Sequence, residues 1–131
     1  MIGPLPSFDA ALVLRVGGDV VYSHGDVDRA FPLASVTKPI VAWSVLVAVE
    51  RGLISLDNPA GPEGATVRHL LAHASGLPFE GRRPVAAPGK RRIYSNEGFD
   101  ILGEVVAEAS GMGVAQWVRQ TVFDPLGMGS A

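Results

Sequence analysis

The sequence predicts an α+β fold in which an N-terminal β-hairpin precedes a mostly helical region. Residues 10–16 and 20–23 are β-rich runs joined by a Gly-Gly-Asp turn, a pattern typical of a hairpin. Helical patterns follow in four segments, at residues 37–51, 67–74, 97–109 and 114–123. Two strands are too few to support four helices. We therefore expect an incomplete sheet, which either pairs with a second copy or is completed by strands outside this sequence.

The composition favours one domain and excludes several chemistries. With 131 residues, we expect a single incomplete domain over 1–131, with the hairpin in 1–30 and the helical region in 31–131. Cysteine is absent, which excludes disulfides, thiolate catalysis and cysteine-based zinc sites. The net charge is −2, so there is no global attraction to nucleic acid or to an anionic membrane.

The N-terminus and the longest apolar run provide evidence about where in the cell the protein is located. The first six residues lack a basic segment followed by an apolar stretch, so they do not resemble a signal peptide. The apolar run at 40–49 is shorter than the ~20 residues that a membrane span needs. We expect a cytoplasmic protein without a membrane segment; a leader preceding this sequence would make it an exported one.

Each helical segment has its own start and stop signals. Apolar residues surround the axis of 37–51, which predicts a buried helix that Gly52 ends. Thr66 is placed to cap the second segment, and Ser110-Gly111 to end the third. Trp43 and Trp117 lie on helical faces, where we expect them in the core.

Ser35 and Lys38 stand three residues apart at the start of the apolar helix, so one helical face presents both. A serine hydroxyl is a weak nucleophile until a base accepts its proton, and a neutral lysine can be that base. By themselves the two residues favour a simpler interpretation, a helix-capping serine and a solvated lysine.

Further stretches of the sequence relate Ser35 and Lys38 to the motifs of a known superfamily. Residues 33–38 resemble the catalytic S-x-x-K box of the serine β-lactamase and penicillin-binding protein superfamily. Residues 94–96, Tyr-Ser-Asn, resemble the Y-x-N box of its class C β-lactamase, DD-peptidase and esterase branch. Residues 70–78 are similar to the superfamily's L-L-x-H-x-S-G-L-P stretch, and 88–89 and 125–128 are similar to further landmarks in the same order. The resemblance implies a β-lactamase/transpeptidase-like fold.

The resemblance also implies roles. Ser35 would be the acylated nucleophile, and Lys38 and Tyr94 the proton-transfer groups. Which of these two is the base stays open. Asn96 would bind the acyl side chain of the substrate and Lys38. The Ser35 N–H, at the positive end of the helix, would form half of an oxyanion hole.

One landmark of the superfamily is missing. No K-T-G, H-T-G or H-S-G occurs, although such a box lines the site in the superfamily. We therefore expect the N-terminal portion of a longer hydrolase, or a truncated product. The alternative function is a catalytically inactive fragment that acts as a binding or assembly module.

Other residues admit simpler interpretations. His69 and His73 have helical zinc-ligand spacing, but Leu70 stands where a metalloprotease has glutamate, so we expect a structural His73 and no metal. Tyr94 and Asn96 could also be an amphipathic helix entrance and its cap. The five basic residues within 82–92 favour a solvated loop, which as the rim of a site would favour substrates with a carboxylate.

The leading prediction is a serine hydrolase of the β-lactamase-like superfamily, forming an acyl-enzyme from an ester, amide or β-lactam. Without a visible leader, an esterase or general β-lactamase-like hydrolase is favoured over a cell-wall peptidase. No cofactor, nucleic acid or membrane partner is expected. Exposed apolar surface and an unpaired strand edge predict self-association.

Overall fold

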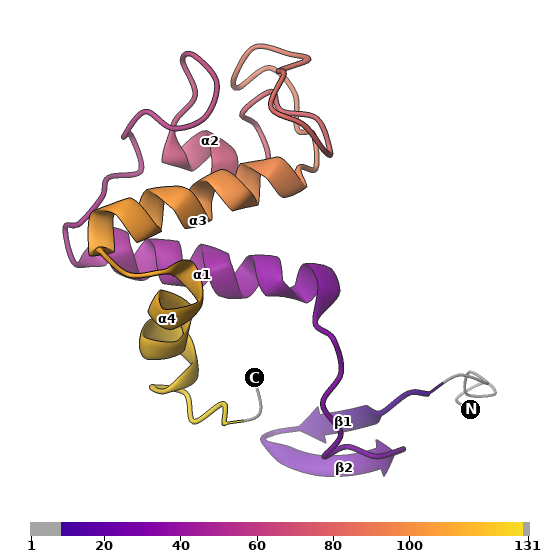
Figure 1. Ribbon diagram of the computed structural model, residues 1–131. Helices are drawn as coiled ribbons and strands as arrows, with labels where there is room; N and C mark the ends of the chain where they lie inside the picture. Colours follow the sequence, from indigo (N-terminus) through magenta and orange to yellow (C-terminus); the bar gives the residue numbers. More distant parts are fainter. Residues whose placement is uncertain (1–8, 130–131) are drawn as a thin grey trace. The chain divides into compact units, whose positions relative to one another are not determined.

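The computed structural model describes residues 9–129. The chain forms two compact units that divide between Pro32 and Leu33. The first contains the strands and the second contains all the helices, so each is described by itself (Figure 1).

The first unit is an antiparallel hairpin of β1 (Leu12–Val16) and β2 (Asp19–His24). Gly17 and Gly18 form its turn with φ of 60° and 96°, the positive values that a tight hairpin connection requires. The turn is one residue shorter than predicted, because Asp19 pairs with Val16 and already belongs to β2. Within the hairpin itself no strand residue is buried.

The second unit contains every helical segment that the sequence predicted. In chain order these are η1 (Ala34–Val36), α1 (Thr37–Glu50), α2 (Val67–Leu71), α3 (Asn96–Ser110), α4 (Val114–Val118) and the π-helical turn η2 (Arg119–Phe123). Helix α3 lies along α1 and also contacts α2, while α4 packs on both α1 and α3 (Figure 1). The core between them consists of Val45, Ala48, Val67, Leu70, Leu77, Ile101, Leu102, Val106 and Trp117.

Helix α1 is less buried than predicted. Only Ser44, Val45 and Ala48 are buried, and Trp43 is 59% exposed. The expectation of a helix buried all round, with Trp43 in the core, is therefore wrong for the described chain, because α3, α4 and η2 leave part of α1 uncovered. Trp117 is in the core as predicted: it is 1% exposed and its indole N–H donates to the Ser44 carbonyl at 3.0 Å.

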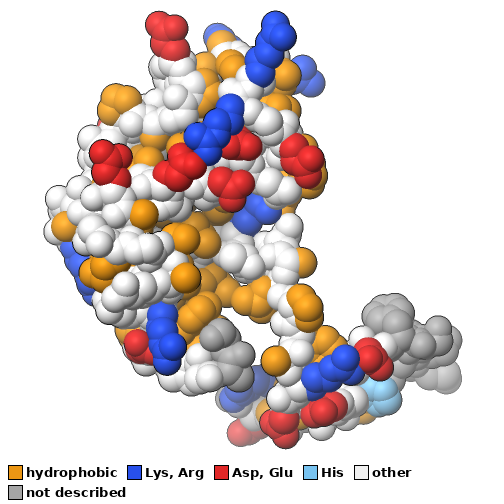
Figure 2. Space-filling view, in the orientation of Figure 1, with side chains coloured by type: hydrophobic (Ala, Val, Ile, Leu, Met, Phe, Trp, Pro, Cys, Tyr) orange, Lys and Arg blue, Asp and Glu red, His pale blue; other side chains and the backbone are white. Residues whose placement is uncertain are grey.

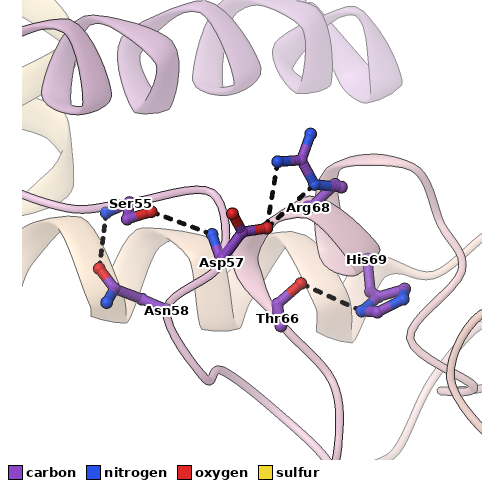
Figure 3. Close-up of polar contacts among 6 residues, drawn as sticks. All are labelled: Ser55, Asp57, Asn58, Thr66, Arg68 and His69. Atoms are coloured by element: carbon purple, nitrogen blue, oxygen red, sulfur yellow. Dashed lines mark hydrogen bonds and ion pairs between the residues drawn. The ribbon is translucent and has the colours of Figure 1, made fainter.

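Helix α2 is also shorter than predicted. It ends at Leu71, and His73 then has a φ of 56°, which no right-handed helix can include. Thr66 does not cap α2 with its side chain. Its hydroxyl instead pairs with Nδ1 of His69 at 3.0 Å, while Arg68 reaches back to Asp57 in the preceding loop (Figure 3).

Local capping fixes both ends of α3. The Ser95 hydroxyl accepts a hydrogen bond from the Gly98 N–H at 3.1 Å, and Gly111 ends the helix with a φ of 69°. Ser95 is therefore the cap rather than Asn96. Tyr94 consequently stands directly before the cap residue, and Asn96 is the first residue of α3.

Charged side chains of both signs are interspersed over the face of the helical unit that contains α3 and the loops beside α2 (Figure 2). Within residues 9–129, no helix combines the length and the apolar character that crossing a bilayer requires.

Candidate active site

Ser35 lies in η1, immediately before α1. The preceding residue, Ala34, has a φ of 45°, a left-handed conformation that costs a residue with a Cβ about 1–2 kcal/mol. Such local strain is commonest where a side chain must be held at a particular point. Ser35 is exposed at the positively polarised N-terminal end of α1.

Lys38, in the first turn of α1, connects Ser35 to α3. Its Nζ donates to the Ser35 Oγ at 3.4 Å and to the Asn96 Oδ1 at 2.6 Å. The second bond is short, as expected for an ammonium donor, and the first is at the long limit. Asn96 therefore anchors the amine, which lies within reach of the serine hydroxyl.

Tyr94 also lies next to Lys38 and Ser35. Nζ of Lys38 lies 4.7 Å from the centroid of the Tyr94 ring. The Ser35 hydroxyl and then the Lys38 ammonium, both as hydrogen-bond donors, lower the pKa of the Tyr94 phenol below its ordinary 10.0. Tyr94 is 43% exposed, so the phenol is accessible to a molecule arriving from solvent.

The loop between α2 and α3 holds Tyr94 in place. The Phe79 carbonyl accepts the Asn96 N–H at 2.9 Å, and the Phe79 ring stacks on the Tyr94 ring at 6.0 Å. Gly76 lets this loop fold on itself, because a Cβ there would lie 1.9 Å from the Ala86 carbonyl oxygen. These contacts join chain segments that are distant in sequence.

His73 belongs to the same cluster. It is 8% exposed, and its ring lies 4.6 Å from the Tyr94 ring. Burial, followed by the charges of Arg92 and Lys38, lowers the pKa of His73, so the imidazole is neutral at pH 7. The Nδ1 of His69 pairs with the Thr66 hydroxyl at 3.0 Å.

Sequence reasoning missed the part that His73 and Phe79 play around Tyr94. Both lie in or next to the 70–78 stretch, which resembles a landmark of the superfamily. That stretch is the available signal, but the ring contacts with Tyr94 span 15 and 21 residues and no local pattern predicts them.

The basic loop is partly neutralised. Arg82 pairs with Glu97 and Glu104, both on α3. The hydrogen bond to Glu104, and then the one to Glu97, raises the pKa of Arg82, so the guanidinium stays charged at any ordinary pH. A pocket of about 500 Å³ between α1 and α3 is lined by Lys38 and Asn96, with Val41, Phe99 and Gly103 among its other lining residues.

The structure thus brings together all four residues singled out from the sequence, Ser35, Lys38, Tyr94 and Asn96. A hydroxyl lies beside an anchored amine and a phenol with a lowered pKa. The arrangement can activate the hydroxyl as a nucleophile and return its proton to a leaving group.

The fold is similar to that of a β-lactamase and of a penicillin-binding protein homologue of known structure. The sequence profile described as Beta-lactamase matches residues 8–131, and this chain belongs to that family. The resemblance inferred from the motifs is confirmed.

Three relatives illustrate the range of the family. A crystal structure of a β-lactamase from Mycobacterium bovis is 53% identical, with a TM-score of 0.81 over 84% of this chain and 40% of that one. Penicillin-binding protein 4* of Bacillus subtilis is 27% identical over 97% of this chain and 38% of its own length. Esterase EstB of Burkholderia gladioli is 35% identical over 77% of this chain and 38% of its own length. The chain therefore spans about two-fifths of the length of these relatives.

Proposed function

We propose that this chain provides the nucleophilic half of a serine hydrolase site that cleaves an ester or amide, including the strained amide of a β-lactam, through an acyl-enzyme. The observation that supports it most directly is the position of Lys38 Nζ, 3.4 Å from the Ser35 Oγ and 2.6 Å from the Asn96 Oδ1, next to the Tyr94 ring.

In the proposed reaction the Ser35 oxygen attacks the substrate carbonyl carbon while its proton passes to Lys38 or Tyr94. The tetrahedral intermediate collapses, the bond to the leaving alcohol or amine breaks, and the leaving group takes up that proton. Water then attacks the acyl-serine ester by the same route in reverse, releasing a carboxylic acid and regenerating the hydroxyl.

The electrostatics suit either assignment of the base. Lys38 as an ammonium favours the Tyr94 phenolate, which can accept the serine proton. Lys38 as a free amine could accept the proton itself, with Asn96 holding it in place. In this proposal the Ser35 N–H, at the N-terminal end of α1, donates to the oxyanion and stabilises it.

The relatives indicate the class of substrate. One is named as an esterase and another as a penicillin-binding protein, and their names indicate acyl compounds of different kinds. We propose an ester, amide or β-lactam as the substrate class for this chain. The basic residues of the 82–92 loop favour substrates with a carboxylate.

The test is turnover of a nitrophenyl ester, followed by intact-mass measurement of the protein after incubation with the ester and with a β-lactam. The proposal predicts a mass increase equal to one acyl group, and loss of that increase in Ser35→Ala. Ser23→Ala, which removes an exposed serine in β2, is the matched control and should acylate normally. An adduct that persists in Ser35→Ala would contradict the proposed nucleophile.

The second candidate is a chain without turnover that acts as a binding or assembly module. The exposed apolar side chains of α1, Trp43 and Leu46 among them, favour it because they offer a surface for another polypeptide. Ester turnover by the chain alone that Ser35→Ala abolishes would exclude this candidate.

A further inference from the structure

His73 is the buried titratable residue that the proposed mechanism does not use. It follows α2 in a left-handed conformation, with a φ of 56°, which is uncommon for residues other than glycine, although histidine adopts it more readily than most. Specific contacts of His73 must therefore offset the free energy that this backbone conformation costs.

His73 accepts hydrogen bonds from the residues on either side of Tyr94 in the chain. The His73 carbonyl accepts the N–H of Ile93 at 2.7 Å, and its Nδ1 accepts the N–H of Ser95 at 3.2 Å. These donors belong to the residues immediately before and after Tyr94. One residue thus fixes the backbone of the whole Ile93–Tyr94–Ser95 segment.

The second bond defines the state of the imidazole. A backbone N–H can only donate, so Nδ1 must be unprotonated and the neutral ring carries its proton on Nε2. The charged groups that influence the ring are Arg92, from the loop before Tyr94, and Lys38, from α1. Both are cations, and together with burial they disfavour the imidazolium.

The imidazole of His73 also contacts the side chain of Tyr94 itself. The imidazole lies 4.6 Å from the Tyr94 ring and 5.1 Å from the Phe99 ring of α3. Lys38 Nζ in turn lies 4.7 Å from the Tyr94 ring and 5.9 Å from the Phe99 ring. His73 and the Lys38 amine therefore both lie next to the rings of Tyr94 and Phe99.

We propose that His73 is a positioning residue whose neutral imidazole, bonded to the Ser95 N–H and packed at a tilt against the Tyr94 ring, sets the position of the Tyr94 phenol relative to Ser35 and Lys38. The inference rests on the proposed function, since it assigns Tyr94 to proton transfer. Small displacements of such a group are costly: a misplacement of about 1 Å can lower the rate about 100-fold.

Two substitutions separate the contacts of the side chain. His73→Asn keeps a hydrogen-bond acceptor near the position of Nδ1 and tolerates the left-handed backbone, but has no ring. His73→Phe keeps an aromatic ring and removes the acceptor, which leaves the buried Ser95 N–H without its partner.

The first measurement is the ultraviolet titration of Tyr94 in a Tyr22→Phe background, where Tyr94 is the remaining tyrosine. We expect His73→Phe to raise the pKa of Tyr94 towards its ordinary value as the phenol moves away from Ser35 and Lys38, and His73→Asn to keep it lowered. An unchanged titration in His73→Phe would overturn the proposal. This readout needs no catalysis, so it separates failure of the proposal from failure of the proposed function.

The second measurement is kinetic. For a nitrophenyl ester, we expect His73→Phe to lower kcat about 10- to 100-fold with little change in KM, and His73→Asn to restore kcat to within a few-fold of the original. Equal loss in both variants, in proportion to their loss of thermal stability, would show that His73 is only structural.

A third measurement needs no variant and covers the case in which His73→Phe does not fold. The amide resonance of Ser95 should shift as His73 is protonated, with a midpoint below the ordinary histidine pKa. A Ser95 amide that does not respond to that protonation would contradict the bond on which the proposal depends.

Discussion

At the scale of single residues, a small number of atoms determines the chemistry of the site. One amide oxygen, on Asn96, fixes the Lys38 amine, and the Ser35 hydroxyl together with that amine lowers the pKa of the Tyr94 phenol. At a given pH, more of such a phenol is present as the phenolate that can accept a proton than in free tyrosine.

Tyr94→Phe tests the role of this phenol. The variant keeps the ring that Lys38 and His73 contact but loses the proton-transfer group. We expect the rate of acylation of Ser35 to fall about 10²- to 10⁴-fold, the usual contribution of a general acid or base. Stopped-flow measurement of the nitrophenol burst would show it, and Tyr22→Phe in the hairpin is the matched control. A burst rate unchanged in Tyr94→Phe would remove the phenol from the mechanism.

The lowered pKa of His73 also predicts how stability depends on pH. Folding favours the neutral imidazole, so the unfolded chain binds more protons between the folded pKa and the ordinary one. The stability that this group contributes is complete above the unfolded pKa of about 6.5 and is lost as pH falls through the lowered folded pKa.

Urea unfolding of the helical unit at a series of pH values measures this dependence. We expect the free energy of unfolding to decrease on acidification below about pH 6.5, and His73→Asn to flatten that decrease. His69→Asn, which removes a histidine whose Nδ1 pairs with a threonine hydroxyl, is the control and should retain the slope. An identical acid slope in His73→Asn would argue against the neutral, bonded imidazole.

At the scale of elements, the loop between α2 and α3 matters as much as the helices. Gly76 has a φ of 87° and touches the backbone at Ala86, and the Val85 N–H bonds the Gly76 carbonyl at 2.8 Å. This contact holds the part of the loop that leads to Tyr94.

Gly76→Ala should therefore be much more disruptive than the same change at Gly81. Both positions have positive φ, which costs alanine about 1–2 kcal/mol, but only Gly76 would place a Cβ against backbone, since Gly81 has open space around it. Adding about 1–3 kcal/mol for overpacking gives about 2–5 kcal/mol for Gly76→Ala. Thermal or urea unfolding measures both, and equal costs would mean that the close approach is unimportant.

The elements also show what the sequence could and could not predict. The ends of α3 follow from local chemistry, with a serine cap and a glycine stop, and they were predicted to within a residue. The C-terminal end of α2 was wrong, because the conformation of His73 is fixed by Ile93 and Ser95, about 20 residues away. The motifs placed Ser35, Lys38, Tyr94 and Asn96 in one site, but the contacts of His73 and Phe79 depend on a loop whose path no periodicity describes.

At the scale of the molecule, the described chain leaves apolar surface uncovered. Trp43 is 59% and Leu46 is 44% exposed on α1, although the helix is apolar around its whole axis. The prediction that α1 is fully buried failed for this reason: burial depends on what lies against a helix, and composition shows only that something could.

We expect the chain to self-associate through this face of α1. Trp43→Lys combined with Leu46→Glu should shift sedimentation towards the monomer at high concentration. Val85→Glu, at an exposed apolar residue of the 79–92 loop, is the control and should leave association unchanged. A chain that sediments as a monomer without any substitution would contradict the expectation.

Peptide mapping of the chain after exposure to a phosphonate ester shows whether Ser35 is a nucleophile that its neighbours activate. We expect a covalent phosphonyl group on the peptide that contains Ser35, formed much more slowly in Lys38→Met. A label on another residue, or labelling at the same rate in Lys38→Met, would contradict it.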